Sequence, residues 1–312
     1  MTPFTRHLLT AAALLSIPAG LSAHRMWLLP SGTTFSGTTS WVTVDAAISN
    51  DLFFLDHQPG RLEGIKVWQP DGSPGELKNG ATGRYRSTFD VQLDKPGTWK
   101  IGSEMSGVSG SFKIGGVEKR VGGRRGPPPG AGGPGAGGGA GQFVGGPGGG
   151  RPAPGAAGGQ PGAMREPPLT VADIPAGATD VKLTELLSRN EIYVTAGEPT
   201  TMVFKPTNKG LEFAPVTHPS ELVSGEAAKF RFLIDGKPAA GLKVSVIPGG
   251  KRYRDAEGGM ELTTGADGLL TVTWPTAGMY WLNANATDSK TSTPRATERR
   301  MAYSTTLEVM AP

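Results

Sequence analysis

A long stretch of glycine, proline and alanine divides this chain into two parts and limits what it can fold into. The 312-residue sequence contains 48 glycines and 27 prolines, and these residue types with alanine dominate positions 122–162. Such a segment has almost no apolar surface to bury, so we expect 116–168 to be a disordered linker. It lacks a strict Gly-X-Y period, which excludes collagen. A plain spacer is favoured over contacts between its arginines and acidic envelope polymers.

The sequence on both sides of this linker is typical of β-strands. Apolar and polar residues alternate over short runs, and several runs end in Pro-Gly or Asp-Gly turn signals. The alternation is clearest at 41–46, 89–93, 230–234 and 242–247. Five tryptophans fall in such strand patterns and are expected in the core: Trp41, Trp68, Trp99, Trp274 and Trp281.

Short strands separated by turns predict an all-β fold of two immunoglobulin-like antiparallel β-sandwich domains joined by the Gly/Pro-rich segment. We expect an N-terminal sandwich over 24–115 and a C-terminal sandwich over 210–312. The segment 169–209 supplies connecting strands to either one. The only helix candidate is a short segment at 183–189.

Residues 1–23 have the pattern of a cleavable export signal. Arg6 gives a positively charged n-region, residues 8–17 form an apolar h-region, and a small-residue cleavage site ends at Ala23. We expect cleavage there and a periplasmic location. The apolar run is far shorter than the ~20 residues needed to span a bilayer, and no other segment approaches that length, so no transmembrane segment is expected in the mature chain.

Composition and motifs exclude several classes of function. The chain has no cysteine, which excludes disulfides, thiolate metal sites and cysteine catalysis. Six basic and two acidic residues between Gly115 and Pro168 account for the net charge of +4, so no nucleic-acid groove is indicated. There is no Gly-x-Ser-x-Gly elbow, phosphate loop or His-Glu-x-x-His motif. We therefore expect neither an enzyme nor a nucleic-acid partner.

His24 is the strongest metal-ligand candidate. Cleavage after Ala23 would give it a free α-amine beside its own imidazole. Two nitrogen donors on one residue form a chelate suited to a divalent transition metal such as nickel, cobalt or copper. The alternative is that His24 only satisfies the cleavage site or a surface hydrogen bond.

A second imidazole would complete such a chelate, and His57 offers one. It follows Asp56 in a loop that also contains Asp51, and these carboxylates can ligate a metal or orient a ligand. The competing interpretation is an ordinary loop anchored by Phe53 and Phe54.

The third histidine of the expected mature chain, His218, stands before a proline that already explains a bend. A turn-capping role is favoured for it over metal ligation from the second half of the chain. It stays among the candidate metal ligands.

Several segments resemble a periplasmic domain-of-unknown-function family linked to nickel and cobalt uptake, the NikM-like transport accessory proteins. The N-terminal signature Ala-His-x-x-Trp-Leu-x-Pro-Ser and a Gly-Leu-Glu segment carry most of the resemblance. The matching stretches are 23–31, 210–219, 235–241 and 264–268. The resemblance implies an exported β-rich accessory protein that binds or hands over a divalent metal, with an outer-membrane receptor or metal transporter as partner.

Three functions remain open on these observations. The leading hypothesis is a periplasmic metal-binding module for uptake of a nickel- or cobalt-type ion. The second is a non-catalytic structural or interaction protein of the cell envelope. The third and weakest is a copper oxidase that uses a histidine brace, since a shared ligand type does not fix function.

Overall fold

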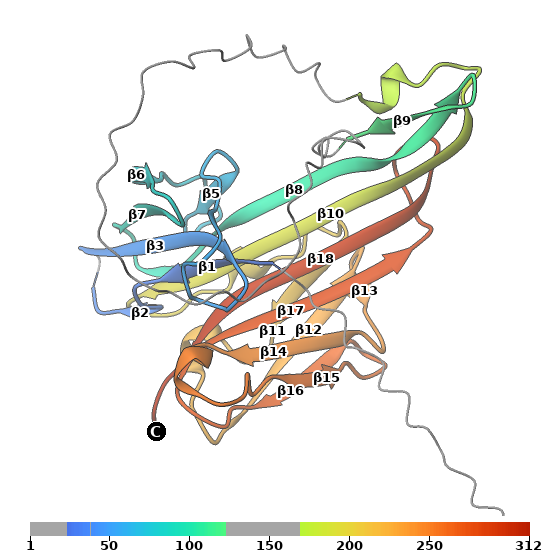
Figure 1. Ribbon diagram of the computed structural model, residues 1–312. Coiled ribbons are helices and arrows are strands. Elements are labelled where there is room, and N and C mark those ends of the chain that lie inside the picture. Colours follow the sequence, from blue (N-terminus) through green and yellow to red (C-terminus); the bar gives the residue numbers. More distant parts are fainter. Residues whose placement is uncertain (1–23, 38, 123–168) are drawn as a thin grey trace, which may run out of the picture.

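The computed structural model describes residues 24–37, 39–122 and 169–312, and within them the chain is built almost entirely from β-strands (Figure 1). The expected signal over 1–23 and most of the expected linker lie outside the described residues. No helix in the described part has the length and apolar character needed to cross a membrane. The helical elements there are short 3-10 helices: η1 (Val171–Asp173), η2 (Met202–Phe204), η3 (Pro219–Glu221) and η4 (Lys251–Tyr253).

A five-stranded sheet, which we call sheet A, belongs to the N-terminal part. Its strand order is β1-β3-β7-β6, with β4 added to the end of β3. Every second residue of β7 is buried, as expected for a strand with one face against a core. The strands are β1 (Arg25–Pro30), β3 (Ser40–Ser49), β4 (Gln58–Pro59), β6 (Lys78–Thr82) and β7 (Ser87–Leu93).

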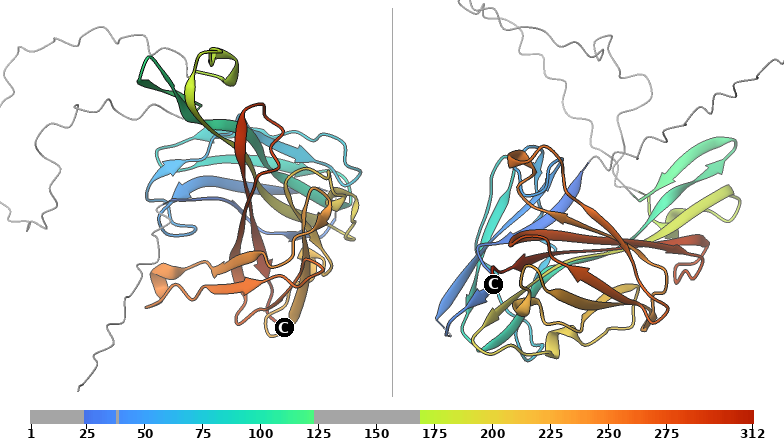
Figure 2. Two further views of the ribbon diagram at one scale, coloured as in Figure 1. Left: turned by 90° about the vertical axis from the view of Figure 1, so that its right-hand side faces the viewer. Right: turned by 90° about the horizontal axis from the view of Figure 1, so that it is seen from below.

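A nine-stranded sheet, sheet B, runs through the whole molecule. Its order is β15-β14-β17-β18-β10-β8-β5, with β2 paired to β10 and β9 paired to β8. The strands are β2 (Thr34–Phe35), β5 (Ile65–Trp68), β8 (Gly97–Ile114), β9 (Val117–Val121), β10 (Thr179–Ala196), β14 (Lys243–Pro248), β15 (Met260–Thr263), β17 (Gly278–Asp288) and β18 (Ala296–Val309). The arm formed by β8, β9 and β10 projects beyond the rest of the fold (Figure 2).

A four-stranded sheet, sheet C, completes the C-terminal part. It contains β11 (Leu211–Pro215), β12 (Ala227–Ile234), β13 (Lys237–Pro238) and β16 (Leu269–Thr273). The turn between β12 and β13 contains Asp235 at φ 50° and Gly236 at φ 74°, a left-handed pair that the Asp-Gly signal favours.

Sheet B separates two hydrophobic cores, because successive side chains of a strand point to opposite faces. Ile192, Val194 and Ala196 of β10 pack in the core beneath sheet A. Tyr193, between them, packs in the larger core beneath sheet C. The molecule is therefore two β-sandwiches that share one central sheet, and the all-β sandwich prediction is confirmed.

The structure differs from the sequence-based expectation in several details. The helix candidate at 183–189 is wrong, because these residues lie inside β10 and pair with both β8 and β18. The β10–β18 pairing is parallel, so the sheets are not purely antiparallel. Residues 117–121, expected within the linker, form β9. Trp41 is 44% exposed rather than in the core.

Candidate functional site

The structure brings two of the candidate metal ligands together. The rings of His24 and His57 are stacked, with their centroids 3.9 Å apart and their planes at 17°. Both residues are exposed to solvent. Two imidazoles at this separation, at the very start of the described chain, form the candidate site.

Strand β3 explains why residues so far apart in sequence meet. Ile48 of β3 pairs with Met26 of β1 and with Gln58 of β4. A strand has only two edges, and Ile48 has one of these partners on each edge. Strands β1 and β4 therefore flank β3 on opposite sides. His24 immediately precedes β1 and His57 immediately precedes β4, so both lie next to the C-terminal end of β3. The pairing register of sheet A therefore places the two rings.

The residue after His24 is tied to the C-terminal half of the chain. Arg25 forms an ion pair with Glu257, in which Nη2 donates to Oε2 at 3.2 Å. Its guanidinium also lies 5.8 Å from the ring centroid of Trp281 in β17. Sequence reasoning missed this anchor, because nothing local signals a partner 232 residues away.

The loop that carries His57 is held by its own side chains. Asp56 accepts hydrogen bonds from the backbone N–H of Asn50 at 3.0 Å and from its Nδ2 at 3.3 Å. Asp51 pairs with Lys251 of η4, whose Nζ donates to Oδ1 at 2.7 Å and whose pKa the carboxylate raises. Both carboxylates therefore already have partners that shape the loop.

A small apolar cluster fixes the same loop to the body of the protein. Trp27, Leu52 and Trp281 are its main buried members. Phe53 lies edge-on to Trp27, with ring centroids 5.5 Å apart, and adopts φ 60°. This left-handed conformation is uncommon for a bulky residue and is held here by the packing of its ring. The loop is thus anchored to the body of the protein by Phe53 and at the same time presents His57 to solvent.

His218 lies apart from the other two histidines. Its Nε2 is 3.0 Å from Oγ1 of Thr98, and its Nδ1 accepts the backbone N–H of Ser220 at 3.1 Å. Burial lowers the pKa of this imidazole. Thr98 pairs with Thr195, whose N–H donates to the carbonyl of Thr33 beyond the far end of β1. His218 therefore caps η3 at the opposite end of β1 from His24.

The arrangement offers a metal ion two imidazole donors. Among the described residues, no group of three or more His, Asp or Glu side chains is arranged to hold a metal ion. A third donor has to come from the main chain, and the nitrogen of His24 becomes an amine only if the chain is cut after Ala23. The donor set then consists of nitrogen atoms, which suit nickel, cobalt, copper and zinc.

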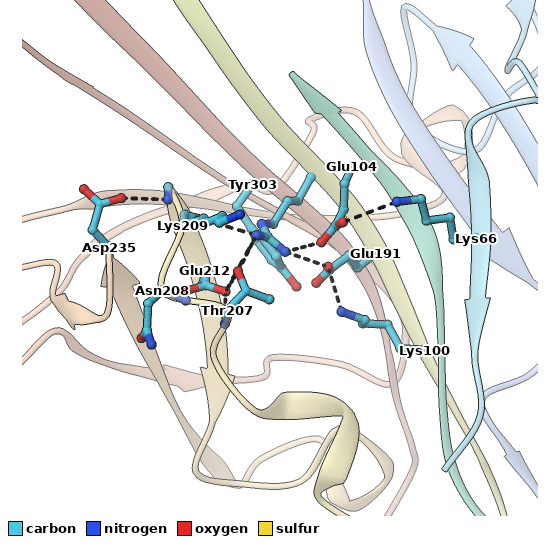
Figure 3. A network of polar contacts seen from close by, with 12 residues as sticks. Lys66, Lys100, Glu104, Glu191, Thr207, Asn208, Lys209, Glu212, Asp235 and Tyr303 are labelled. Carbon is cyan, nitrogen blue, oxygen red and sulfur yellow. Dashed lines mark hydrogen bonds and ion pairs between the residues drawn. The ribbon is translucent and has the colours of Figure 1, made fainter. Parts of the chain in front are cut away.

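A second cluster of charged and polar side chains lies between sheets B and C around Arg189 of β10, and Figure 3 shows its network of polar contacts. The Arg189 guanidinium contacts Glu104, Glu191 at 3.8 Å and Glu212 at 3.7 Å. Glu191 also accepts from the hydroxyl of Tyr193 at 2.8 Å. Burial raises the pKa of Tyr193 well above its ordinary value. The Tyr193 phenol is neutral, and the positive charge of Arg189 is offset by the surrounding glutamates. We therefore interpret this cluster as a structural link between sheets B and C.

Comparison with known protein families finds a match to one family. The model of the family described as "Domain of unknown function (DUF4198)" matches residues 21–288. No curated protein matches the chain.

Among solved structures, the D0-D1 domain of intimin matches over 90% of this chain and 97% of its own, at 8% identity and a TM-score of 0.19. Escherichia coli alpha-2-macroglobulin activated by porcine elastase matches over 92% of this chain and 31% of its own, at 11% identity and a TM-score of 0.19. A marsupial T cell receptor matches over 92% and 74%, at 8% identity and 0.19. TM-scores this low carry no argument about fold or function.

Proposed function

The chain belongs to the family described as Domain of unknown function (DUF4198), and we propose that it is an exported metal-binding accessory protein for uptake of a nickel- or cobalt-type ion. In this proposal the mature chain begins at His24. The terminal amine, the imidazole of His24 and the imidazole of His57 together bind the ion. A membrane receptor or metal transporter receives it.

The observation that carries this proposal is the contact between the His24 and His57 rings, 3.9 Å apart. Stacked rings do not themselves share an ion, so the rings must turn before they ligate. Both side chains are exposed, and rotation about their side-chain bonds disturbs no core. The backbones on either side are held by β3 pairing, so the two donors stay within reach of one ion.

The donor set also suits delivery rather than permanent storage. Three nitrogen donors leave coordination positions open on an ion that prefers four to six ligands. Because the two imidazoles are exposed, a partner protein can approach those open positions directly. The nitrogen set favours late first-row ions, with copper the strongest competitor in affinity.

The remaining candidates take other roles in this proposal. Asp56 and Asp51 keep the loop in place through Asn50 and Lys251, which positions His57. His218 is left out of the site because its ring is committed to hydrogen bonds at the far end of β1.

Calorimetric titration of the exported protein with Ni(II), Co(II), Cu(II) and Zn(II) tests the proposal. Intact mass first establishes whether the chain begins at His24. We expect binding tighter than ~10 µM for at least one of the four ions, and weaker binding to all of them contradicts the proposal. A control protein that keeps Ala23 as an extra residue retains both imidazoles, but the His24 nitrogen becomes an amide and the terminal amine moves one residue away, so we expect its metal affinity and stoichiometry to differ from those of the protein that begins at His24.

Growth under metal limitation separates this function from its alternatives. Replacing His24 with Ala should slow growth when nickel or cobalt is scarce. Unchanged growth together with unchanged partner binding favours a structural role in the envelope. Oxygen consumption by the copper-loaded protein favours the oxidase.

A further inference from the structure

The outward face of sheet A carries an exposed tryptophan. Burial alternates along β3, so Val42 and Val44 lie in the core while Trp41 and Thr43 point outward. Figure 1 shows β3, β7 and β6 on the side of the molecule away from sheet C. Trp41 is 44% exposed and belongs to none of the hydrophobic cores of the described residues. Its indole is therefore accessible to a ligand.

The register of sheet A places polar groups beside this ring. Gln92 of β7 pairs with Trp41, and both side chains point outward. Lys78 of β6 reaches over the same place, where its Nζ donates to Oε1 of Gln92 at 2.9 Å and lies 5.4 Å from the centroid of the Trp41 ring. The amide NH2 of Gln92 remains a hydrogen-bond donor beside the indole.

Hydrogen bonds hold the next polar group of this face in place. Asp90 of β7 accepts from Nδ2 of Asn79 at 2.8 Å and from Oγ1 of Thr43 at 2.7 Å. These bonds lower the pKa of Asp90, so its carboxylate is charged at neutral pH. A carboxylate has about four acceptor positions, so Asp90 can accept further hydrogen bonds. The face is thus rigid before a ligand arrives, which reduces the entropy lost on binding.

A polar groove of about 320 Å³ adjoins the tryptophan. Gln92 and Lys78 belong both to its lining and to the surroundings of the Trp41 ring. Glu76 and Asp94 also line the groove, and both are exposed. Among the described residues that line it, Lys78 is the only cation. The groove therefore has a net negative charge and offers carboxylate oxygens as hydrogen-bond acceptors.

The chemistry of this face suits a neutral sugar. A pyranose ring has an apolar C–H face that packs against an indole, and hydroxyl groups that donate to carboxylates and accept from amides and ammonium groups. The negative charge of the groove disfavours anionic polysaccharides and nucleic acids. A protein interface has a contiguous apolar centre, whereas Gln92 and Thr43, the neighbours of Trp41 on this face, are polar.

We propose that the outward face of sheet A around Trp41 binds a neutral oligosaccharide. One sugar ring packs on the indole, and hydroxyl groups of the chain bond to Gln92, Lys78 and the carboxylates of the groove. The histidine pair lies next to the other end of β3. The eight residues from Trp41 to Ser49 span roughly 26 Å at the rise of a β-strand, so this site is independent of any metal function.

Titration calorimetry of the whole mature protein tests the proposal with three six-sugar chains. Cellohexaose and chitohexaose are neutral and offer glucose or N-acetylglucosamine rings, and hexagalacturonate is anionic. We expect saturable binding of at least one neutral chain with Kd below ~1 mM, and the tighter of the two identifies the preferred sugar. Hexagalacturonate should bind at least about tenfold more weakly, because the carboxylates of the groove repel it.

Three protein variants locate the site. Trp41→Ala should weaken binding at least about tenfold, because it removes the stacking surface. Gln92→Leu should also weaken it, and this variant serves if Trp41→Ala does not keep the circular dichroism spectrum. Tyr85→Ala is the control and should leave affinity within about twofold, since Tyr85 is an exposed aromatic residue at the opposite end of β7 from Gln92.

Four results would overturn the proposal. They are no binding of either neutral chain at 1 mM, equal or tighter binding of hexagalacturonate, and binding that neither Trp41→Ala nor Gln92→Leu weakens. The fourth is a dimer in solution that Trp41→Ala dissociates, because the face would then be an interface between copies of this chain.

Discussion

At the scale of single residues, exposure separates the histidines by role. His24 and His57 are exposed and meet only through their rings, so their nitrogen atoms are accessible to an ion. His218 is half-buried, and its nitrogen atoms lie against Thr98 and the N–H of Ser220. The same residue type therefore serves as a candidate ligand in one place and as a structural hydrogen-bonding group in the other.

Matched glutamine substitutions test this division of roles. We expect His57→Gln to weaken nickel or copper binding by about tenfold or more, because it removes one nitrogen donor. His218→Gln should leave metal affinity within about twofold. Titration calorimetry on both proteins checks this, and equal losses from the two substitutions would remove His57 from the site.

His218 also predicts a pH dependence of stability. Its pKa is lowered in the folded protein because burial disfavours the imidazolium, and the carbonyl of Thr200 and the carboxylate of Glu221 only partly offset this. Below the ordinary value of about 6.5 the unfolded chain takes up a proton more readily than the folded one. Stability therefore falls as pH drops through that window. Urea unfolding at pH 7.5 and 5.5 should show a smaller loss for His218→Gln than for the wild type. A larger loss in the variant contradicts the assignment.

At the scale of elements, one buried arginine joins two hairpins. Arg299 in β18 is 6% exposed, and its Nη2 lies 2.7 Å from Oδ2 of Asp235 and 2.7 Å from Oδ2 of Asp288. Asp235 lies in the β12–β13 turn and Asp288 ends β17. Arg299 lowers the pKa of both carboxyl groups, so their stabilising contribution is present near neutral pH and is lost as the pH falls toward and below their ordinary value.

Replacing this arginine should be costly. Arg299→Met leaves two carboxylates facing each other without a cation, and we expect a loss of about 3 kcal/mol in the free energy of unfolding. Arg300→Met is the matched control, since Arg300 is exposed and paired with Glu298 at the surface, and should cost less than about 1 kcal/mol. Urea denaturation measures both. Similar losses in the two variants would show that the Arg299 network contributes little.

Elements were predictable where the pattern was local and not where the partner was distant. The alternation in 89–93 and 230–234 marked real strands, and the Asp-Gly turn after Ile234 is a real hairpin. The helix candidate at 183–189 failed, because pairing with β8 and β18 on both sides outweighs a weak local preference. In the site, His24 and His57 were identifiable by residue type. The Arg25–Glu257 and Asp51–Lys251 pairs were not, because each joins segments about 200 residues or more apart.

At the scale of the whole molecule, the shared sheet makes the two sandwiches interdependent. Residues of β10 contribute to the core beneath sheet A and to the core beneath sheet C. Since β10 and β18 follow the segment 123–168 in sequence, the N-terminal sandwich is incomplete without the C-terminal half.

This interdependence predicts how fragments behave. A protein cut once between 123 and 168, at an introduced protease site, should elute as one particle and unfold in a single calorimetric transition, because β8 and β10 remain paired. The fragment 24–122 expressed alone should lack cooperative unfolding. Two separate transitions, or a folded 24–122 fragment, would contradict the shared-sheet description.

In the proposed metal site, three nitrogen atoms of His24 and His57 hold one ion. Electron paramagnetic resonance of the copper(II)-loaded protein, with its mass confirmed to begin at His24, tests this directly through the nitrogen hyperfine splitting. We expect splitting from three nitrogens, reduced to two in His57→Gln and altered in the protein that keeps Ala23. A spectrum identical in all three proteins would contradict it.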